Sequence, residues 1–213
     1  MDAETQATTV PAAPPAQAGT ALRSANGSAS NTTKSAGSPS PITVPDGWET
    51  FDGASLGKDD PDLLNSRRVA LFFYPVAYVP TDACAWEGAL VQIDPTAEAF
   101  VDAMAAQAST VSTPVVEVMV GDYAGLEFDH AAESDIDITN CDDDKLCIYS
   151  DLADDCNGTQ YPYAGVRETY RAVDLNGERA VIALYQDDES INPALRKEAR
   201  AVFDSIEFAK PDE

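Results

Sequence analysis

The chain has 213 residues and a formal net charge of −24, from 37 acidic and 13 basic side chains. A negative charge of this size argues against nucleic acid and anionic membrane surfaces as partners, because both would repel the protein. It favours high solubility, cationic partners or a high-salt environment. No stretch reaches the roughly 18 apolar residues that are typical of a membrane-spanning helix.

Residues 1–43 differ in composition from the rest of the chain. They are rich in Ala, Thr, Ser, Pro and Gly and contain no aromatic residue. Because such a segment buries too little apolar surface to offset the entropy of ordering, we predict a disordered stalk or linker. Its acidic and basic residues cancel, so the net charge belongs to residues 44–213. We predict that these residues form a single globular domain.

The first half of this domain contains two predicted strands and a helix. A polar loop is expected over residues 55–66, and residues 67–79, RRVALFFYPVAYV, indicate a core strand. Residues 84–93 indicate a second strand or strand-like loop. Asp94-Pro95-Thr96 predicts the start of a helix, because apolar residues then recur at helical spacing as far as residue 108.

The second half is dominated by turn signals. Residues 115–131 predict a hairpin around Gly121-Asp122, and residues 136–139, IDIT, predict a short strand. Asn176-Gly177 between two β-rich runs is a strong hairpin signal. A second helix is predicted from Asn192, with Pro193 at its first position. Consecutive strands and two amphipathic helices predict an α+β fold, an antiparallel β-sheet flanked by two main α-helices.

Three of the four cysteines lie in residues 141–156, CDDDKLCIYSDLADDC, together with six aspartates. The absence of a C-x-x-C pair argues against a zinc or iron–sulfur site. The preceding DIDIT begins like a calcium-binding EF-hand loop, but Asn140 replaces the required glycine and Leu146 the bidentate glutamate. An irregular calcium site is the alternative to a solvated acidic face, with candidate ligands Asp135, Asp137, Asp142, Asp143 and Asp144.

Four cysteines in an exported domain allow three disulfide connectivities. We favour Cys147–Cys156, which closes the acidic loop, together with Cys84–Cys141. Two disulfides predict an extracytoplasmic, oxidising location. The opening MDAETQATTV lacks the basic and apolar regions of a secretory signal, so this hypothesis requires a processed or misassigned start, or a signal or lipoprotein anchor.

Several short motifs resemble the PsbP-like α+β domain of exported actinobacterial envelope proteins. They are VPDGW at residues 44–48, GDYAGLE at 121–127, ALRKEARAVFDSIEF at 194–208, the C-x-W of Cys84-Ala85-Trp86, and the D-x-x-x-C-D that begins at Asp137. The resemblance covers about residues 44–208. It implies a fold and a non-catalytic adaptor or binding role, and it carries over no catalytic residues.

Residues suited to catalysis are few. His130 is the only histidine and follows a predicted strand, where we expect a surface or turn residue. No G-x-S-x-G, H-E-x-x-H or P-loop motif occurs. A carboxylate-based hydrolase is the alternative enzyme, although no pair of acids stands out among so many. Trp86, Tyr161 and Tyr163 are candidate ligand-facing aromatics, with packing in the core as the competing interpretation.

The sequence therefore predicts a non-catalytic extracytoplasmic binding or sensing module on a flexible stalk, secreted or attached to the cell envelope. We expect a monomer that needs no cofactor and binds a protein, a peptide or a cell-wall ligand. Two alternatives remain at this point. One is the carboxylate-based hydrolase, and the other is a halophilic acidic cytosolic protein with reduced cysteines.

Overall fold

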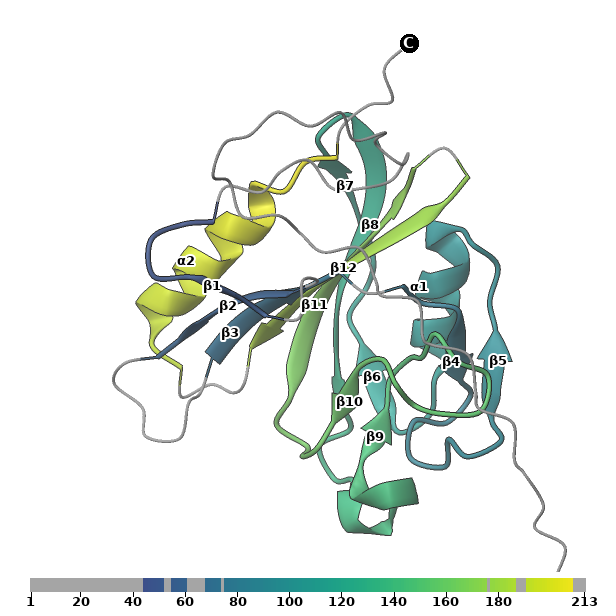
Figure 1. Cartoon of the computed structure of the whole chain (residues 1–213). Helices are drawn as coiled ribbons and strands as arrows, with labels where there is room; N and C mark the ends of the chain where they lie inside the picture. The colour runs from purple at the N-terminus through teal and green to yellow at the C-terminus, as the bar shows by residue number, and fades with distance from the viewer. Residues whose placement is uncertain are drawn as a thin grey trace, which may run out of the picture.

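Three long antiparallel strands form the centre of the fold in the computed structural model (Figure 1). They are β8 (Tyr123–Ala132), β11 (Arg167–Asp174) and β12 (Arg179–Gln186). The structure describes residues 44–51, 55–60, 68–73, 75–175, 177–186 and 191–208. The predicted disordered stalk, residues 1–43, lies outside the described residues.

These strands belong to an eight-stranded sheet with the order β1-β2-β3-β12-β11-β8-β6, in which β7 also pairs with β8. The other members are β1 (Glu49–Phe51), β2 (Ser55–Asp59), β3 (Arg68–Phe72), β6 (Thr110–Ser112) and β7 (Val116–Val120). Two small antiparallel sheets pair β4 (Tyr78–Pro80) with β5 (Leu90–Gln92) and β9 (Leu146–Cys147) with β10 (Gln160–Tyr161). With the helices α1 (Ala97–Ala106) and α2 (Pro193–Asp204), this arrangement confirms the predicted α+β class.

The two faces of the large sheet carry separate apolar cores, because successive side chains of a strand point to opposite faces. Tyr170 and Ala172 of β11 belong to the first core, which also contains Phe100 of α1. Val173 belongs to the second core, which contains Phe203 of α2. We call these the α1-side core and the α2-side core. Figure 1 shows the two helices on opposite sides of the sheet.

Both helices begin where the sequence predicts. The Thr96 hydroxyl accepts a hydrogen bond from the Ala99 backbone N–H at 3.1 Å before α1, and the Asn192 side chain accepts one from Ala194 at 2.8 Å before α2. These contacts satisfy N–H groups that lack a partner within the helix. Neither α1 nor α2 has the length and apolar character needed to cross a lipid bilayer, and no other helix in the described ranges does.

Three predicted elements differ from the structure. The expected strand over residues 67–79 is interrupted, because β3 ends at Phe72 and β4 begins at Tyr78, and Pro75 between them has no backbone N–H to donate. Only Leu90–Gln92 of residues 84–93 forms a strand. Part of the expected polar loop instead forms β2, which pairs with β1 and β3.

The predicted strand at residues 136–139 is also wrong. The chain forms a 3₁₀ turn there, η1 (Ile138–Asn140), followed by a second one, η2 (Asp142–Asp144). The Asp137 carboxylate accepts hydrogen bonds from the backbone N–H of Thr139 at 3.2 Å and from its hydroxyl at 2.7 Å. Such local bonds favour a turn over an extended strand.

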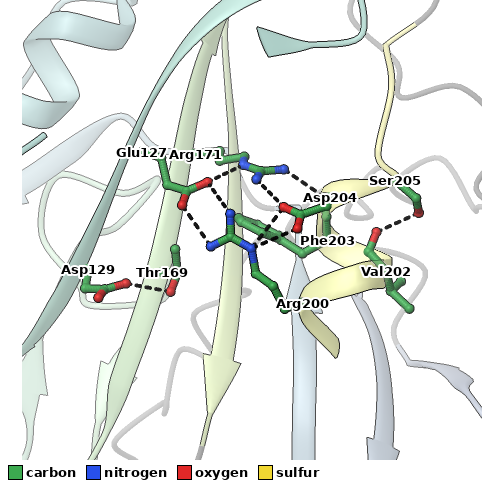
Figure 2. A network of polar contacts seen from close by, with 9 residues as sticks. All are labelled: Glu127, Asp129, Thr169, Arg171, Arg200, Val202, Phe203, Asp204 and Ser205. Carbon is green, nitrogen blue, oxygen red and sulfur yellow. Dashed lines mark hydrogen bonds and ion pairs between the residues drawn. The ribbon is translucent and has the colours of Figure 1, made fainter. Parts of the chain in front are cut away.

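A network of charged side chains holds the end of α2 against the sheet (Figure 2). Arg171 of β11 donates to Glu127 of β8 at 2.6 Å and to the Phe203 carbonyl at 3.0 Å, and it pairs with Asp204. Arg200 donates to the second Glu127 oxygen at 2.8 Å. Burial alone would raise the pKa of Asp204, but hydrogen bonds from Arg200 and Arg171 outweigh it and lower that pKa. Two cations and two anions balance here, which fits a structural role.

Candidate functional site

β6 and β7 form one bulged strand along β8 at an edge of the large sheet. Ser112 lies opposite His130 and Val116 opposite Glu127, so three residues of the edge strand face only two of β8. This mismatch is a β-bulge. β7 then turns into β8 through Gly121-Asp122, and the φ of +60° at Gly121 fits the first central position of a type II′ turn. The predicted hairpin around these two residues is therefore present.

The edge strand exposes apolar side chains to solvent. Val111 is 55% exposed, Val116 52% and Met119 65%. Val118 instead packs toward the α2-side core, so alternation places Glu117 and Met119 on the α1 side of the sheet. In the part of the chain that the structure describes, β7 pairs only with β8. An exposed apolar edge of this kind is available for pairing with another strand.

A groove of about 420 Å³ lies between this edge and the start of α1. Its lining includes apolar groups and three carboxylates, namely Ala97, Met119, Leu126, Glu98, Glu117 and Asp174. Gly125 lies at its base, where an added Cβ would come within 3.1 Å of the Ala172 carbonyl oxygen. The absence of a side chain therefore allows β8 to lie close to β11 beneath the groove.

The chemistry of the groove is that of a cation-accepting surface with apolar contacts. Among the described residues, its lining contains carboxylates but no lysine, arginine or histidine. One Asp174 oxygen accepts a hydrogen bond from the Gly177 backbone N–H at 2.9 Å, which stabilises the β11–β12 turn. Among the described residues, no group of three or more His, Cys, Asp or Glu side chains is placed to hold a metal ion. The groove is thus suited to positively charged side chains.

A second polar cluster lies inside the α1-side core. Glu168 of β11 is fully buried, and its Oε2 accepts hydrogen bonds from the Tyr161 hydroxyl at 3.1 Å and from the Tyr170 hydroxyl. Its Oε1 has no hydrogen-bond partner among the residues that the structure describes. Burial raises the pKa of Glu168 to about 7, although both tyrosine hydrogen bonds act to lower it. Burial also raises the pKa values of Tyr161 and Tyr170 well above 10, so both remain neutral donors.

His130 is buried in the same core, which corrects the expectation of a surface or turn residue. Its ring lies 2.8 Å (Nδ1) from the Ser112 hydroxyl and 3.2 Å (Nε2) from Gln107 Oε1. Gln107 uses its own N–H groups on the carbonyls of Pro80 and Ile148, so its Oε1 accepts and His130 Nε2 carries the proton. Burial lowers the pKa of His130 to about 3, so the ring is neutral.

Neither Glu168 nor His130 is part of the groove lining. Both are buried, and their hydrogen bonds link strands within the core. A general acid or base must reach the group whose proton it transfers. These two residues are therefore not placed to act on a molecule bound in the groove.

The cysteine-rich stretch contains no free thiol. Disulfides join Cys84 to Cys141 and Cys147 to Cys156, which is the pairing favoured from the sequence. Trp86 packs against the second disulfide, is 4% exposed and donates through Nε1 to the Asp142 carbonyl at 3.2 Å. The expectation that Trp86 faces a ligand is therefore corrected, because its ring forms a small core with the disulfide.

The other two aromatic residues that were predicted to face a ligand differ in their exposure to solvent. Tyr161 is fully buried beside Glu168, so the expectation that it faces a ligand is also wrong. Tyr163 is 40% exposed, and its hydroxyl lies 3.3 Å from that of Tyr185. Only Tyr163 of the three predicted aromatics is accessible, and it is not part of the groove lining.

The predicted calcium ligands are engaged separately rather than gathered around one point. The Asp137 carboxylate caps η1, and the hydrogen bonds from Thr139 lower its pKa. Asp142 accepts from the Glu87 backbone N–H at 2.9 Å, and Asp143 pairs with Lys145 at 3.4 Å. The remaining two candidates, Asp135 and Asp144, are exposed. The stretch is a disulfide-bonded acidic surface, which corrects the calcium alternative.

The groove was not predicted, because its carboxylates lie on α1, β7 and β11 and are far apart in the sequence. A usable signal was present in VVEVMV, residues 115–120, a strongly β-forming run with a single charged residue. Such a run predicts a β-strand, but only the sheet topology shows that this strand lies at an exposed edge. Comparisons of the chain with models of protein families, with curated proteins and with solved structures found no match.

Proposed function

We propose that this domain is a non-catalytic extracytoplasmic binding module that binds a positively charged partner in the groove beside β7. The observation that carries the proposal is the groove itself, in which apolar side chains lie beside three carboxylates at an exposed sheet edge. The net charge of −24 attracts cations toward the whole domain. The groove then supplies a local surface on which such a partner can be held.

The proposed location rests on the cysteines. All four form disulfides, and disulfides persist in oxidising compartments rather than in the cytosol. A domain secreted or attached to the cell envelope would keep them. The proposed binding role is also the one implied by the PsbP-like domain that the sequence motifs resemble.

The experiment that tests the proposal is a titration of the full chain with heptalysine. Isothermal titration calorimetry measures the affinity, and chemical-shift changes of the backbone amides locate the binding site. Exposed charge pairs each contribute about 0.5 kcal/mol, so removing two should weaken binding about fivefold. We therefore expect Glu98→Gln/Glu117→Gln to show this loss. Amide shifts in the wild type should concentrate around Glu98, Glu117 and Met119.

The matched control is Glu87→Gln/Asp151→Asn, which removes two exposed charges outside the groove. It should bind heptalysine with an affinity within about twofold of the wild type. Equal losses in the two double variants, or amide shifts centred on residues 142–155, would show attraction to the overall charge and would contradict a groove site. Heptaglutamate provides the negative probe.

A further inference from the structure

We propose that the partner is an extended basic segment of another polypeptide, which adds a strand to the edge of β7 that no other described strand occupies. This inference rests on the proposed function and names its partner class. Addition of a peptide strand to a sheet edge is a common mode of recognition, in which backbone hydrogen bonds supply affinity and alternate side chains supply specificity. The backbone direction of β7, its accessibility and the surrounding charge each support it.

The backbone of β7 presents hydrogen-bonding groups at the groove. In a hairpin with a two-residue turn, the residues that flank the turn, here Val120 and Tyr123, form a hydrogen-bonded pair. Pairs alternate along the ladder, so the backbone groups of Glu117 and Met119 point away from β8. Side chains of these same two residues line the groove. A strand added here would therefore contact the open backbone edge and the groove together.

Protection of the sheet edge is uneven. Edge strands are commonly blocked by prolines, bulges and charged side chains. Pro114 and the bulge lie between β6 and β7, so they interrupt the edge before β7 begins. Along the five residues of β7 the only charged side chain is Glu117, and Val116, Glu117 and Met119 are exposed. β7 is therefore a longer uninterrupted part of the exposed edge than β6.

The negative charge of the groove and of the whole chain indicates which kind of strand would pair with β7. A second copy of the chain would bring another net charge of −24 and a second Glu117 to the same edge, which repulsion disfavours. A partner strand with basic residues on one face would place them near Glu98, Glu117 and Asp174. Its other face would meet Val116 and Val118, which favours apolar residues there. The preferred segment thus alternates basic and apolar residues.

The experiment uses the full chain and the probe peptide acetyl-KVKVKVK-amide, with binding measured by calorimetry. Met119→Pro removes the outward N–H of β7, which β8 does not use, while Met119→Ala removes the side chain but keeps that N–H. We expect Met119→Pro to lower the affinity for the probe about tenfold, and Met119→Ala to lower it by less than about threefold. Circular dichroism and thermal melting check that both variants are folded.

A second probe tests the same inference without altering the protein. The peptide with N-methyl groups on alternate residues keeps its charge and side chains but loses backbone donors along one edge. We expect it to bind the wild-type chain about tenfold more weakly than the unmodified peptide. Equal affinities of the two peptides would overturn strand addition even if Met119→Pro failed to fold.

The outcomes separate this inference from the proposed function. If the unmodified peptide bound Met119→Pro and Met119→Ala equally well, with the loss in Glu98→Gln/Glu117→Gln retained, strand addition would be wrong and the cationic groove would stand. If neither heptalysine nor the alternating peptide bound the wild type, the proposed function would fail as well. A dimer of the wild type in sedimentation that Met119→Pro converts to monomer would assign the edge to a second copy and overturn the partner class.

Discussion

Glu168 makes the stability of the fold depend on pH, because its surroundings favour the neutral carboxyl group. Burial raises its pKa from 4.5 to about 7 in the folded state. Between these two values the folded chain binds a proton that the unfolded chain has released, so stability falls as pH rises. The contribution of the neutral carboxyl is fully present below pH 4.5 and is lost as pH increases through 7.

We predict that Glu168→Gln removes this dependence. The difference in free energy of unfolding between variant and wild type should shift in favour of the variant by about 3 kcal/mol from pH 4.5 to pH 8. Urea denaturation at several pH values measures it. The pH dependence of wild-type stability alone is insufficient, because His130 also contributes to it. The pKa of His130 is lowered in the folded state, so its contribution to stability is lost as pH falls, whereas that of Glu168 is lost as pH rises. Exposed Glu133→Gln is the control, and a pH-independent difference for Glu168→Gln would contradict the prediction.

At the scale of secondary-structure elements, α2 depends on a buried cation for its attachment to the sheet. The side chain of Arg171 is 6% exposed, and its guanidinium carbon lies 4.2 Å from the centroid of the Phe203 ring while the group contacts Glu127 and Asp204 (Figure 2). Arg200 bonds to the same acids but is 42% exposed. Removal of Arg171 leaves the buried Glu127 with only the more exposed Arg200 and takes away the donor to the Phe203 carbonyl, whereas water can replace Arg200.

We therefore expect Arg171→Met to lower the free energy of unfolding by about 3 kcal/mol and Arg200→Met by about 1 kcal/mol. Guanidinium or urea denaturation at pH 6 gives both values. The double variant Glu127→Leu/Arg171→Met removes both buried charges and should recover a large part of the loss. Similar losses in the two single variants would show that burial of Arg171 does not determine the energy of the network.

A glycine just after the acidic loop is required for packing rather than for backbone freedom. A Cβ on Gly158 would overlap the backbone carbonyl oxygen of Tyr149, a residue buried in the α1-side core. We predict that Gly158→Ala costs about 2 kcal/mol or more in unfolding free energy. Gly165→Ala is the matched control, because its Cβ would meet only the Tyr163 ring at 3.6 Å. A loss within about 0.5 kcal/mol for both variants would refute the steric argument.

The elements that the sequence predicts well are those defined by local contacts. Thr96 and Asn192 cap helices through groups two or three residues away, and the turns at Gly121 and Gly177 have the positive φ that glycine allows. Asn176 itself lies outside the described residues. β2 was missed because SLGKD has few β-forming residues, and only its pairing with β1 and β3 makes it a strand.

Features that depend on distant contacts were not predictable in this way. His130 is buried because Gln107 and Ser112 satisfy its nitrogens, and neither residue is adjacent in sequence. The groove likewise requires the pairing of β8 with both β7 and β11. Acidic residues are so abundant in this chain that only the topology distinguishes Glu98, Glu117 and Asp174 from the others.

At the scale of the whole molecule, the two disulfides differ mainly in the length of chain that each one closes. Cys84 and Cys141 are 57 residues apart, whereas Cys147 and Cys156 are 9 apart. A cross-link restricts the unfolded chain more when its loop is longer. The longer loop contains α1, β6, β7 and β8.

We predict that Cys84→Ala/Cys141→Ala lowers the free energy of unfolding by about 4 kcal/mol, and Cys147→Ala/Cys156→Ala by about 3 kcal/mol. Urea denaturation of the two double variants, compared with the wild type, measures each contribution. A larger loss for the shorter loop would show that the packing of Trp86 on Cys147 and Cys156 outweighs the entropy of closure.

The longer disulfide also has a mechanical consequence. A pulling force applied between β1 and α2 would extend the chain as it unfolds. The force would pass through the Cys84–Cys141 disulfide and not along the segment between these two residues. That bypass shortens the maximum extension by roughly 190 Å. Both α1 and β7, which flank the groove, lie inside the bypassed segment. The bond therefore excludes α1 and β7 from the covalent load path, so tension on the unfolding chain would not stretch these two walls of the groove.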